Sequence, residues 1–114
     1  MDDCLFCKIA AKQIPAKIVY EDERLVAFDD IRPQAPVHTL IIPKEHFASL
    51  NDVPEDRAGL LAAILVAARK IAGDKGIAAS GYRIVLNTAR DSGQEVFHIH
   101  FHLLGGRRMT WPPG

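Results

Sequence analysis

Three histidines recur at every second position in the run HIHFHLL, which covers residues 98–104. Side chains of an extended strand alternate between its two faces, so this spacing predicts a strand with His98, His100 and His102 on one face and apolar side chains on the other. Near neutral pH an imidazole can act as a nucleophile, a proton shuttle or a metal ligand, so the shared face predicts a chemical site. The alternative is three solvated histidines on an edge strand, but histidine is not a favoured strand residue.

The composition indicates one compact domain over residues 1–114, of which 48% are hydrophobic. Lys plus Arg and Asp plus Glu are equal at 14 each, so no basic excess points to nucleic-acid binding. No apolar stretch approaches the ~18 residues of a membrane span, and the acidic N-terminus lacks the basic region of a signal peptide. With only two cysteines, three positions apart, we expect a reducing, cytoplasmic location and no disulfide framework.

Local patterns predict an α+β fold. Residues 4–11 have the composition of a short helix that Asp2 or Asp3 could cap, and β-rich patterns recur in five later segments. The connections are too short for several βαβ crossovers, so we expect a five-stranded antiparallel meander sheet covered by one long helix. The strands are expected at residues 17–20, 24–28, 38–43, 82–87 and 98–104.

The long helix is predicted over residues 54–74. Asn51 or Asp52 could cap it, Pro54 suits its first turn, and Gly73 and Gly76 would end it. Apolar residues recur at spacings of three and four and form one stripe that would pack on the sheet. These residues are Leu60, Leu61, Ile64, Leu65, Ala68 and Ile71.

Several motifs together resemble the histidine triad family, whose signature alternates histidine with hydrophobic residues. The resemblance rests on Asn87, the Gly93-Gln94 pair, the run over 98–104 and the WPPG ending. Matching segments at residues 14–17, 28–31, 33–36, 38 and 42–46 extend it over nearly the whole chain. The chain is most similar to the Hint branch, the nucleoside phosphoramidases. This similarity implies a histidine-triad fold and cleavage of the P–N bond of AMP- or GMP-amines.

The resemblance also implies a covalent mechanism that requires no cofactor. The middle histidine, His100, would attack the α-phosphorus and form a nucleotidyl-histidine that water hydrolyses, so that one hard displacement becomes two easier ones. His102 would contact the phosphate and assist proton delivery. His38 would help to orient His100, and a buried structural histidine is the alternative for that position.

By the same resemblance, Asp30 would bind the ribose hydroxyls, Ile31 would flank the purine, and Asn87 would contact phosphate or ribose. For Asp30 and Asn87 the alternative is a turn-forming role. Backbone N–H groups would cradle the phosphate oxygens, and they belong to Gly93, Gln94, Glu95 and Val96. Glu95 is a departure, because animal Hint proteins carry serine there and a carboxylate would repel phosphate unless it points away.

Cys4 and Cys7 lie on one face if residues 4–11 are helical, so their thiols could supply half of a tetrahedral zinc site. Some bacterial triad proteins and related nucleotidylyltransferases carry a similar Cys-x-x-Cys with histidines that match His46 and His98. The resemblance therefore implies a structural zinc site at these four residues. Two reduced cysteines that pack a helix are the alternative, and a thioredoxin-like role is disfavoured because that motif should follow a strand.

Other functions stay open on the sequence. The triad could form a three-histidine zinc site with an open water position, as in zinc hydrolases. The chain could also be a dinucleoside polyphosphate hydrolase or a nucleotide-binding regulatory module with little turnover. Nucleotidyl transfer is disfavoured, because family transferases carry glutamine where this chain has His102.

The C-terminal segment, residues 105–114, has no core periodicity and contains Trp111 and two prolines, which disfavours another strand. In the Hint branch such a tail reaches toward the partner's active site, so the resemblance implies a two-fold homodimer. A frayed tail is the alternative.

Overall fold

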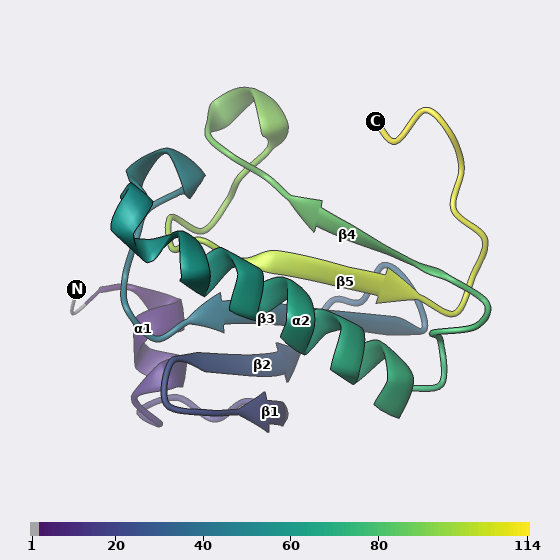
Figure 1. The fold of residues 1–114 in the computed structure, drawn as a ribbon, viewed down its shortest axis with the longest axis horizontal. Helices are drawn as coiled ribbons and strands as arrows, with labels where there is room; N and C mark the ends of the chain where they lie inside the picture. Colours follow the sequence, from purple (N-terminus) through teal and green to yellow (C-terminus); the bar gives the residue numbers. More distant parts are fainter. Residues whose placement is uncertain (1–2) are drawn as a thin grey trace.

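A computed structural model describes residues 3–114. Five strands form one antiparallel sheet: β1 (Ile18–Glu21), β2 (Leu25–Asp29), β3 (Val37–Pro43), β4 (Tyr82–Leu86) and β5 (Phe101–Gly105). Helix α2 (Ala58–Asp74) lies across one face of the sheet, and the short helix α1 (Leu5–Ala10) packs near the other (Figure 1). The predicted α+β fold with one long and one short helix is therefore confirmed.

The strand order is β1-β2-β3-β5-β4, which differs from the sequential order of the expected meander. After β3 the chain passes through α2 to the far edge of the sheet and forms β4 there. Strand β5 then fills the position between β3 and β4 and is antiparallel to both. This arrangement places the histidine run in the middle of the sheet, next to β3.

The sheet carries apolar side chains on both faces, because neighbouring residues of a strand point to opposite sides. On the α2 side, the buried strand residues Leu25, Ala27 and Ile41 pack with Ile99, Phe101, Leu103 and the helix stripe. On the α1 side, the buried residues are Phe6, Ile9, Val26, Phe28, Leu40 and Ile42. The predicted apolar face of the histidine run is thus core, and the Phe6 ring lies edge-on to His98 and His100 on the other side.

Strand β5 begins at Phe101 rather than at His98, so only His102 of the three histidines lies on a strand. His98 and His100 lie in the chain just before it. The backbone N–H of Ile99 donates to a loop carbonyl at 2.7 Å instead of continuing the sheet. The prediction of one strand over all three histidines is therefore wrong, although their separation from the apolar side chains holds.

Helix α2 begins at Ala58 rather than at Pro54. Two short 3₁₀ turns precede it, Leu50–Asp52 and Glu55–Arg57. The Ser49 hydroxyl caps the first turn, and Asp52 accepts a hydrogen bond from the Ser49 backbone. Neither expected residue therefore caps α2: Asp52 belongs to the capping box of this turn, and Asn51 lies within it.

No helix within residues 3–114 has the length and apolar character that crossing a bilayer requires. The C-terminal segment leaves the sheet beyond β5 and forms no further strand, as expected (Figure 1). Two arginines tie it to the body: Arg83 donates to the Thr110 carbonyl at 2.9 Å, and Arg107 donates to the Gln34 carbonyl at 2.9 Å. Trp111 is 81% exposed.

Candidate active site and cysteine–histidine cluster

The His100 ring is buried, and its Nδ1 lies 2.8 Å from the backbone carbonyl oxygen of His98. A carbonyl oxygen can only accept, so the proton of the neutral ring is on Nδ1 and Nε2 keeps its lone pair. Burial lowers the pKa of His100, although the bond to His98 and the charge of Asp30 oppose this shift. His100 therefore offers an unprotonated Nε2 at neutral pH, which is the form a nucleophile needs.

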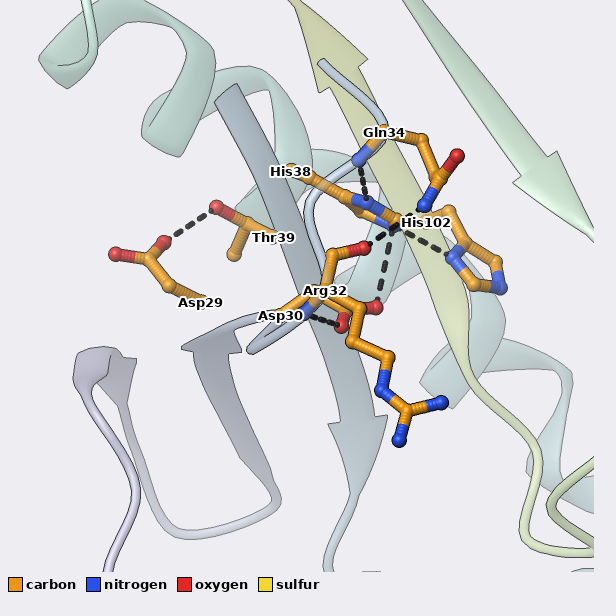
Figure 2. A network of polar contacts seen from close by, with 7 residues as sticks. All are labelled: Asp29, Asp30, Arg32, Gln34, His38, Thr39 and His102. Carbon is orange, nitrogen blue, oxygen red and sulfur yellow. Dashed lines mark hydrogen bonds and ion pairs between the residues drawn. The ribbon is translucent and has the colours of Figure 1, made fainter. Parts of the chain in front are cut away.

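His38 and His102 form a hydrogen-bonded pair (Figure 2). The backbone N–H of Gln34 donates to His38 Nδ1 at 3.0 Å, so the neutral His38 ring carries its proton on Nε2. That nitrogen lies 2.9 Å from His102 Nδ1 and 3.5 Å from a carboxylate oxygen of Asp30. His102 Nδ1 is then the acceptor, and its own proton is on Nε2. His38 thus orients His102, and not His100 as the family resemblance implied.

The pair is electrically neutral at pH 7. Burial is the largest cause that lowers the pKa of His38, and Asp30 acts in the opposite direction. Burial, followed by the nearby His100 and His38, lowers the pKa of His102 to about 4. A second proton on His102 would lie on Nδ1, directly opposite the Nε2–H of His38. His102 therefore offers one N–H donor on its free side.

Asp30 follows the end of β2, and one of its carboxylate oxygens accepts the backbone N–H of Arg32 at 2.8 Å (Figure 2). Its neighbour Asp29 anchors the strand end from the other side. Asp29 accepts from the buried Thr39 hydroxyl at 3.0 Å and from Lys75 at 3.2 Å. These roles of Asp29 and Thr39 were not predicted from the sequence, where the one available signal was a threonine within the apolar run HTLIIP.

Three further predicted binding residues have free side chains. Ile31 is 93% exposed beside Asp30. Asn87 follows β4, and continuing the β4–β5 register by one pair places it opposite His100. The Asn87 amide makes no hydrogen bond with residues 3–114. Glu95 is exposed, and within that same range it forms no ion pair.

The loop before the histidines offers fewer backbone donors than predicted. Gly93, in a left-handed conformation with φ 86°, donates its N–H to Arg90, and Gln94 donates its N–H to Ala89. Both groups are used because the loop closes a tight turn at this point. The N–H groups of Glu95 and Val96 find no acceptor in the part of the chain that the structure describes, so these two remain for an anion.

Cys4, Cys7, His46 and His98 converge beside α1, with all four ligand atoms within 4.8 Å of one another. The Sγ–Nδ1 distances are 3.4 Å for Cys4–His98 and 3.3 Å for Cys7–His46, and the two histidine Nδ1 atoms are 3.1 Å apart. A tetrahedral zinc ion with ordinary bond lengths would separate sulfur and nitrogen ligands by about 3.6 Å and two nitrogens by about 3.3 Å. The four residues therefore fit zinc.

The surroundings of the cluster also suit a metal. The Nε2–H of His98 donates to the Pro43 carbonyl at 2.8 Å, so the lone pair on Nδ1 faces the cluster. Burial lowers the pKa of His98 to about 4, which keeps the ring neutral. Burial and then Cys4 raise the pKa of Cys7 to about 11, and a coordinated zinc ion would deprotonate such a thiol. The backbone N–H of Cys7 donates to Cys4 Sγ at 3.3 Å, which fixes the position of that sulfur.

A second group of ligand atoms, from Asp30, His38 and His102, also lies within 4.8 Å. This group does not suit a metal, because the Gln34 N–H keeps the facing nitrogen of His38 protonated. The three triad rings do not share a centre either. Nδ1 of His98 faces the cysteines, Nδ1 of His100 faces a carbonyl, and Nδ1 of His102 faces His38. The geometry therefore disfavours a three-histidine zinc hydrolase.

Comparisons with known proteins identify the family of the chain. The family model described as HIT domain matches residues 11–109. A purine nucleoside phosphoramidase of Escherichia coli K12 is 49% identical over 108 residues, which cover 95% of this chain and 91% of that protein. The crystal structure of a HIT family hydrolase from Legionella pneumophila is 60% identical with a TM-score of 0.96, and covers 98% of this chain and 100% of that one. A HIT family hydrolase from Clostridium thermocellum is 51% identical with a TM-score of 0.94, with 96% of each chain covered. The chain belongs to the HIT domain family.

Proposed function

We propose that this protein is a purine nucleoside phosphoramidase, a hydrolase that cleaves the P–N bond of AMP- or GMP-amines. The observation that carries the proposal is the buried His100 ring: its Nδ1–H is held by a carbonyl, and its Nε2 has no hydrogen-bond partner within residues 3–114. The similarity to a relative named for this activity supports it.

The reaction takes two displacements at phosphorus. First, His100 Nε2 attacks the α-phosphorus, the P–Nε2 bond forms, and the electron pair of the P–N bond leaves with the amine. Then the oxygen of water bonds to phosphorus, the P–Nε2 bond breaks, and His100 returns to its neutral form. One water is consumed: its oxygen and one hydrogen end on the nucleotide, and its other hydrogen ends on the amine.

His102 serves in this scheme as a hydrogen-bond donor to a phosphate oxygen, where negative charge develops. It holds a single proton on Nε2, because the Nε2–H of His38 faces its Nδ1. The leaving nitrogen is then protonated before the attack, since His102 has no second proton to give. Protonation of a phosphoramidate nitrogen makes the amine a neutral leaving group.

The rest of the nucleotide would contact residues near the histidine pair and the loop before His98. The Asp30 carboxylate would bind the ribose hydroxyls, and Ile31, which is exposed, would flank the purine. Asn87 and the N–H groups of Glu95 and Val96 would contact the phosphate. The Glu95 side chain is exposed, so a backbone contact there is compatible with its charge.

Hydrolysis of AMP-amines, compared with hydrolysis of diadenosine polyphosphates, tests the proposal. The wild-type protein should release the amine from an AMP-amine, and His100→Gly should still bind AMP while losing turnover. Each of the five histidines is assigned either to the candidate active site or to the cysteine–histidine cluster, so none can serve as a matched control. AMP binding by the variant is therefore the internal control. Preferred cleavage of diadenosine polyphosphates would make the chain a dinucleoside polyphosphate hydrolase. Binding without either reaction would leave a regulatory module, and unchanged hydrolysis by His100→Gly would refute the nucleophile.

We also propose a structural zinc ion at Cys4, Cys7, His46 and His98. When bound, zinc would cross-link α1 to the two loops that carry the histidines, and it would take no part in the displacements. The expected reducing, cytoplasmic location is consistent with two free thiols. Metal analysis should find about one zinc per chain, and Cys4→Ser should lose it together with thermal stability. Absence of zinc after expression in zinc-supplemented medium would contradict the site.

A homodimer is the third part of the proposal. Among residues 3–114, strand β4 pairs only with β5, so its outer edge could meet a second copy. The C-terminal segment with exposed Trp111 lies near that edge (Figure 1). Sedimentation equilibrium should give twice the 12.6 kDa chain mass. A monomer at micromolar concentration would contradict this expectation.

A further inference from the structure

Two carboxamides lie near the proposed phosphate position, and only one of them is free. Asn87 makes no side-chain hydrogen bond within residues 3–114, whereas Gln94 is a buried residue, 6% exposed, whose amide oxygen and nitrogen are both hydrogen-bonded. Gln94 Oε1 accepts the Ala89 N–H at 2.8 Å, and Gln94 Nε2 donates to the Ala48 carbonyl at 2.7 Å and to the Val96 carbonyl at 3.1 Å. A ligand could reach the Gln94 amide only by breaking these bonds, so it is not a phosphate contact.

The residue that Gln94 holds has an unfavourable backbone. Ala89 has φ 66° and ψ −171°, a region that residues with a Cβ atom rarely adopt. Gln94 binds both polar groups of Ala89: its side chain accepts the N–H, and its own N–H donates to the carbonyl at 3.3 Å. These two bonds close a ring that keeps Ala89 in this conformation and fixes the start of the loop.

The same amide fixes the end of the loop. The bond to the Val96 carbonyl spans the segment whose Glu95 and Val96 N–H groups are unclaimed, and His98 follows two residues later. The bond to Ala48 ties this segment to the loop that carries His46. The direction of the two free N–H groups therefore depends on Gln94.

We infer that Gln94 is a positioning residue for phosphate recognition, which acts through Ala89 and the backbone of residues 95–96 and does not touch the nucleotide. This inference rests on the proposed function, because it assumes that the two N–H groups meet a nucleotide phosphate. Gln94 and Asn87 therefore have different roles, because the Asn87 amide is available for direct contact with the phosphate.

Binding of AMP and of adenosine to Gln94→Ala tests the inference, with Gln13→Ala as the matched control. Gln13 is exposed, and its side chain makes no hydrogen bond within residues 3–114. AMP affinity of Gln94→Ala should fall about tenfold or more, which is the effect of about 1.4 kcal/mol of lost conformational preference. The KM for an AMP-amine should rise in parallel. Adenosine, which has no phosphate, should bind within about twofold of wild type.

The decisive measurement is rescue. Glycine adopts the Ala89 conformation without steric cost, so Ala89→Gly added to Gln94→Ala should restore about threefold or more of the AMP affinity. A residue that contacts the phosphate directly could not be rescued in this way. Equal loss of AMP and adenosine affinity, or a selective loss without rescue, would overturn the inference.

If Gln94→Ala does not fold, Gln94→Glu provides the second variant. Glutamate keeps an acceptor for the Ala89 N–H and loses the two donors, so it should also weaken AMP binding and spare adenosine binding. Unchanged AMP affinity in this variant would overturn the inference. Failure of the wild-type protein to bind AMP would instead refute the proposed function, so the two failures are distinguishable.

Discussion

Replacement of His102 by asparagine tests the protonation state of the histidine pair. The pKa of His102 is about 4 in the folded chain, against an ordinary value of 6.5. The unfolded chain therefore binds more protons between pH 6.5 and pH 4. Stability from this residue is fully present above pH 6.5 and is lost as the pH falls. Asparagine retains an acceptor near the position of Nδ1 but does not titrate.

The size of the effect follows from the two pKa values. A difference of about 2.5 corresponds to about 3.4 kcal/mol at about 1.36 kcal/mol per pKa unit, and about 2.4 kcal/mol of it appears between pH 7 and pH 4.5. His102 is only partly buried, so water screens part of the charge. We therefore expect that acidification over this range costs the wild-type protein about 1–2.4 kcal/mol more than the variant.

Urea denaturation of the metal-free proteins at pH 7 and pH 4.5 measures this difference. A chelator keeps metal release from contributing, and the other four histidines are common to both proteins. The difference between the two acid losses then reports His102 together with its effect on the neighbouring His38 and His100. Equal losses in the two proteins would refute the assignment of a neutral, single-proton His102, as would an NMR titration midpoint near 6.5 for this ring.

Three further predictions follow from named contacts. Asp29→Ala should lower the free energy of unfolding by about 1.5–3 kcal/mol, because the buried Thr39 hydroxyl loses a charged acceptor; a loss below about 0.5 kcal/mol in urea denaturation would contradict this. Gly105→Ala should cost about 1–3 kcal/mol, since its new Cβ would lie 2.5 Å from Ile77 Cδ1. Ile77→Val removes that carbon, so the double variant should be less destabilised than the sum of the singles, and additivity would count against the clash. Because the pKa of His100 lies below 6.5 and its neutral form is the nucleophile, the acid limb of kcat/KM should have its midpoint below pH 6.5; a midpoint above that value would argue against this ring.

The apolar face of the histidine run could be predicted from the sequence, because alternation is a property of any extended backbone. The start of β5 could not. Continuing the β3–β5 register past the pair Ile41–Phe101 would place Pro43 opposite Ile99. Proline has no N–H to donate, so the ladder ends there. The free Pro43 carbonyl accepts the His98 ring instead, at 2.8 Å.

The strand order was beyond a local reading of the sequence. Each strand segment could be found from its composition, but the neighbour of β3 is decided by where α2 returns the chain. The helix stripe indicates only that α2 packs on the sheet. The start of α2 was missed for a local reason, since Ser49 and Asp52 form a capping box around a separate 3₁₀ turn.

The residues of the candidate site could be named from the sequence, but their pairing and hydrogen-bond state could not. Gln34 enters the site through its backbone N–H, which almost any residue could supply at that position. Gly93 and Gln94 were expected to offer N–H groups to phosphate, yet the turn around Ala89 uses both. Backbone hydrogen bonds of this kind do not require particular side chains, so the residue types do not predict them.

His98 and His38 show why the backbone groups around a histidine matter for its function. Both are buried histidines with lowered pKa values, and both place a ring nitrogen in a group of possible metal ligands. A carbonyl accepts from His98, so the nitrogen that faces the cysteines is a lone pair, as a metal requires. An N–H donates to His38, so the nitrogen that faces His102 carries a proton and can only donate. The backbone group behind the ring is an acceptor for His98 and a donor for His38. This difference alone makes the first ring a possible metal ligand and the second a hydrogen-bond donor. The spacing of histidines places the rings, but the backbone polar group behind each ring determines its chemistry.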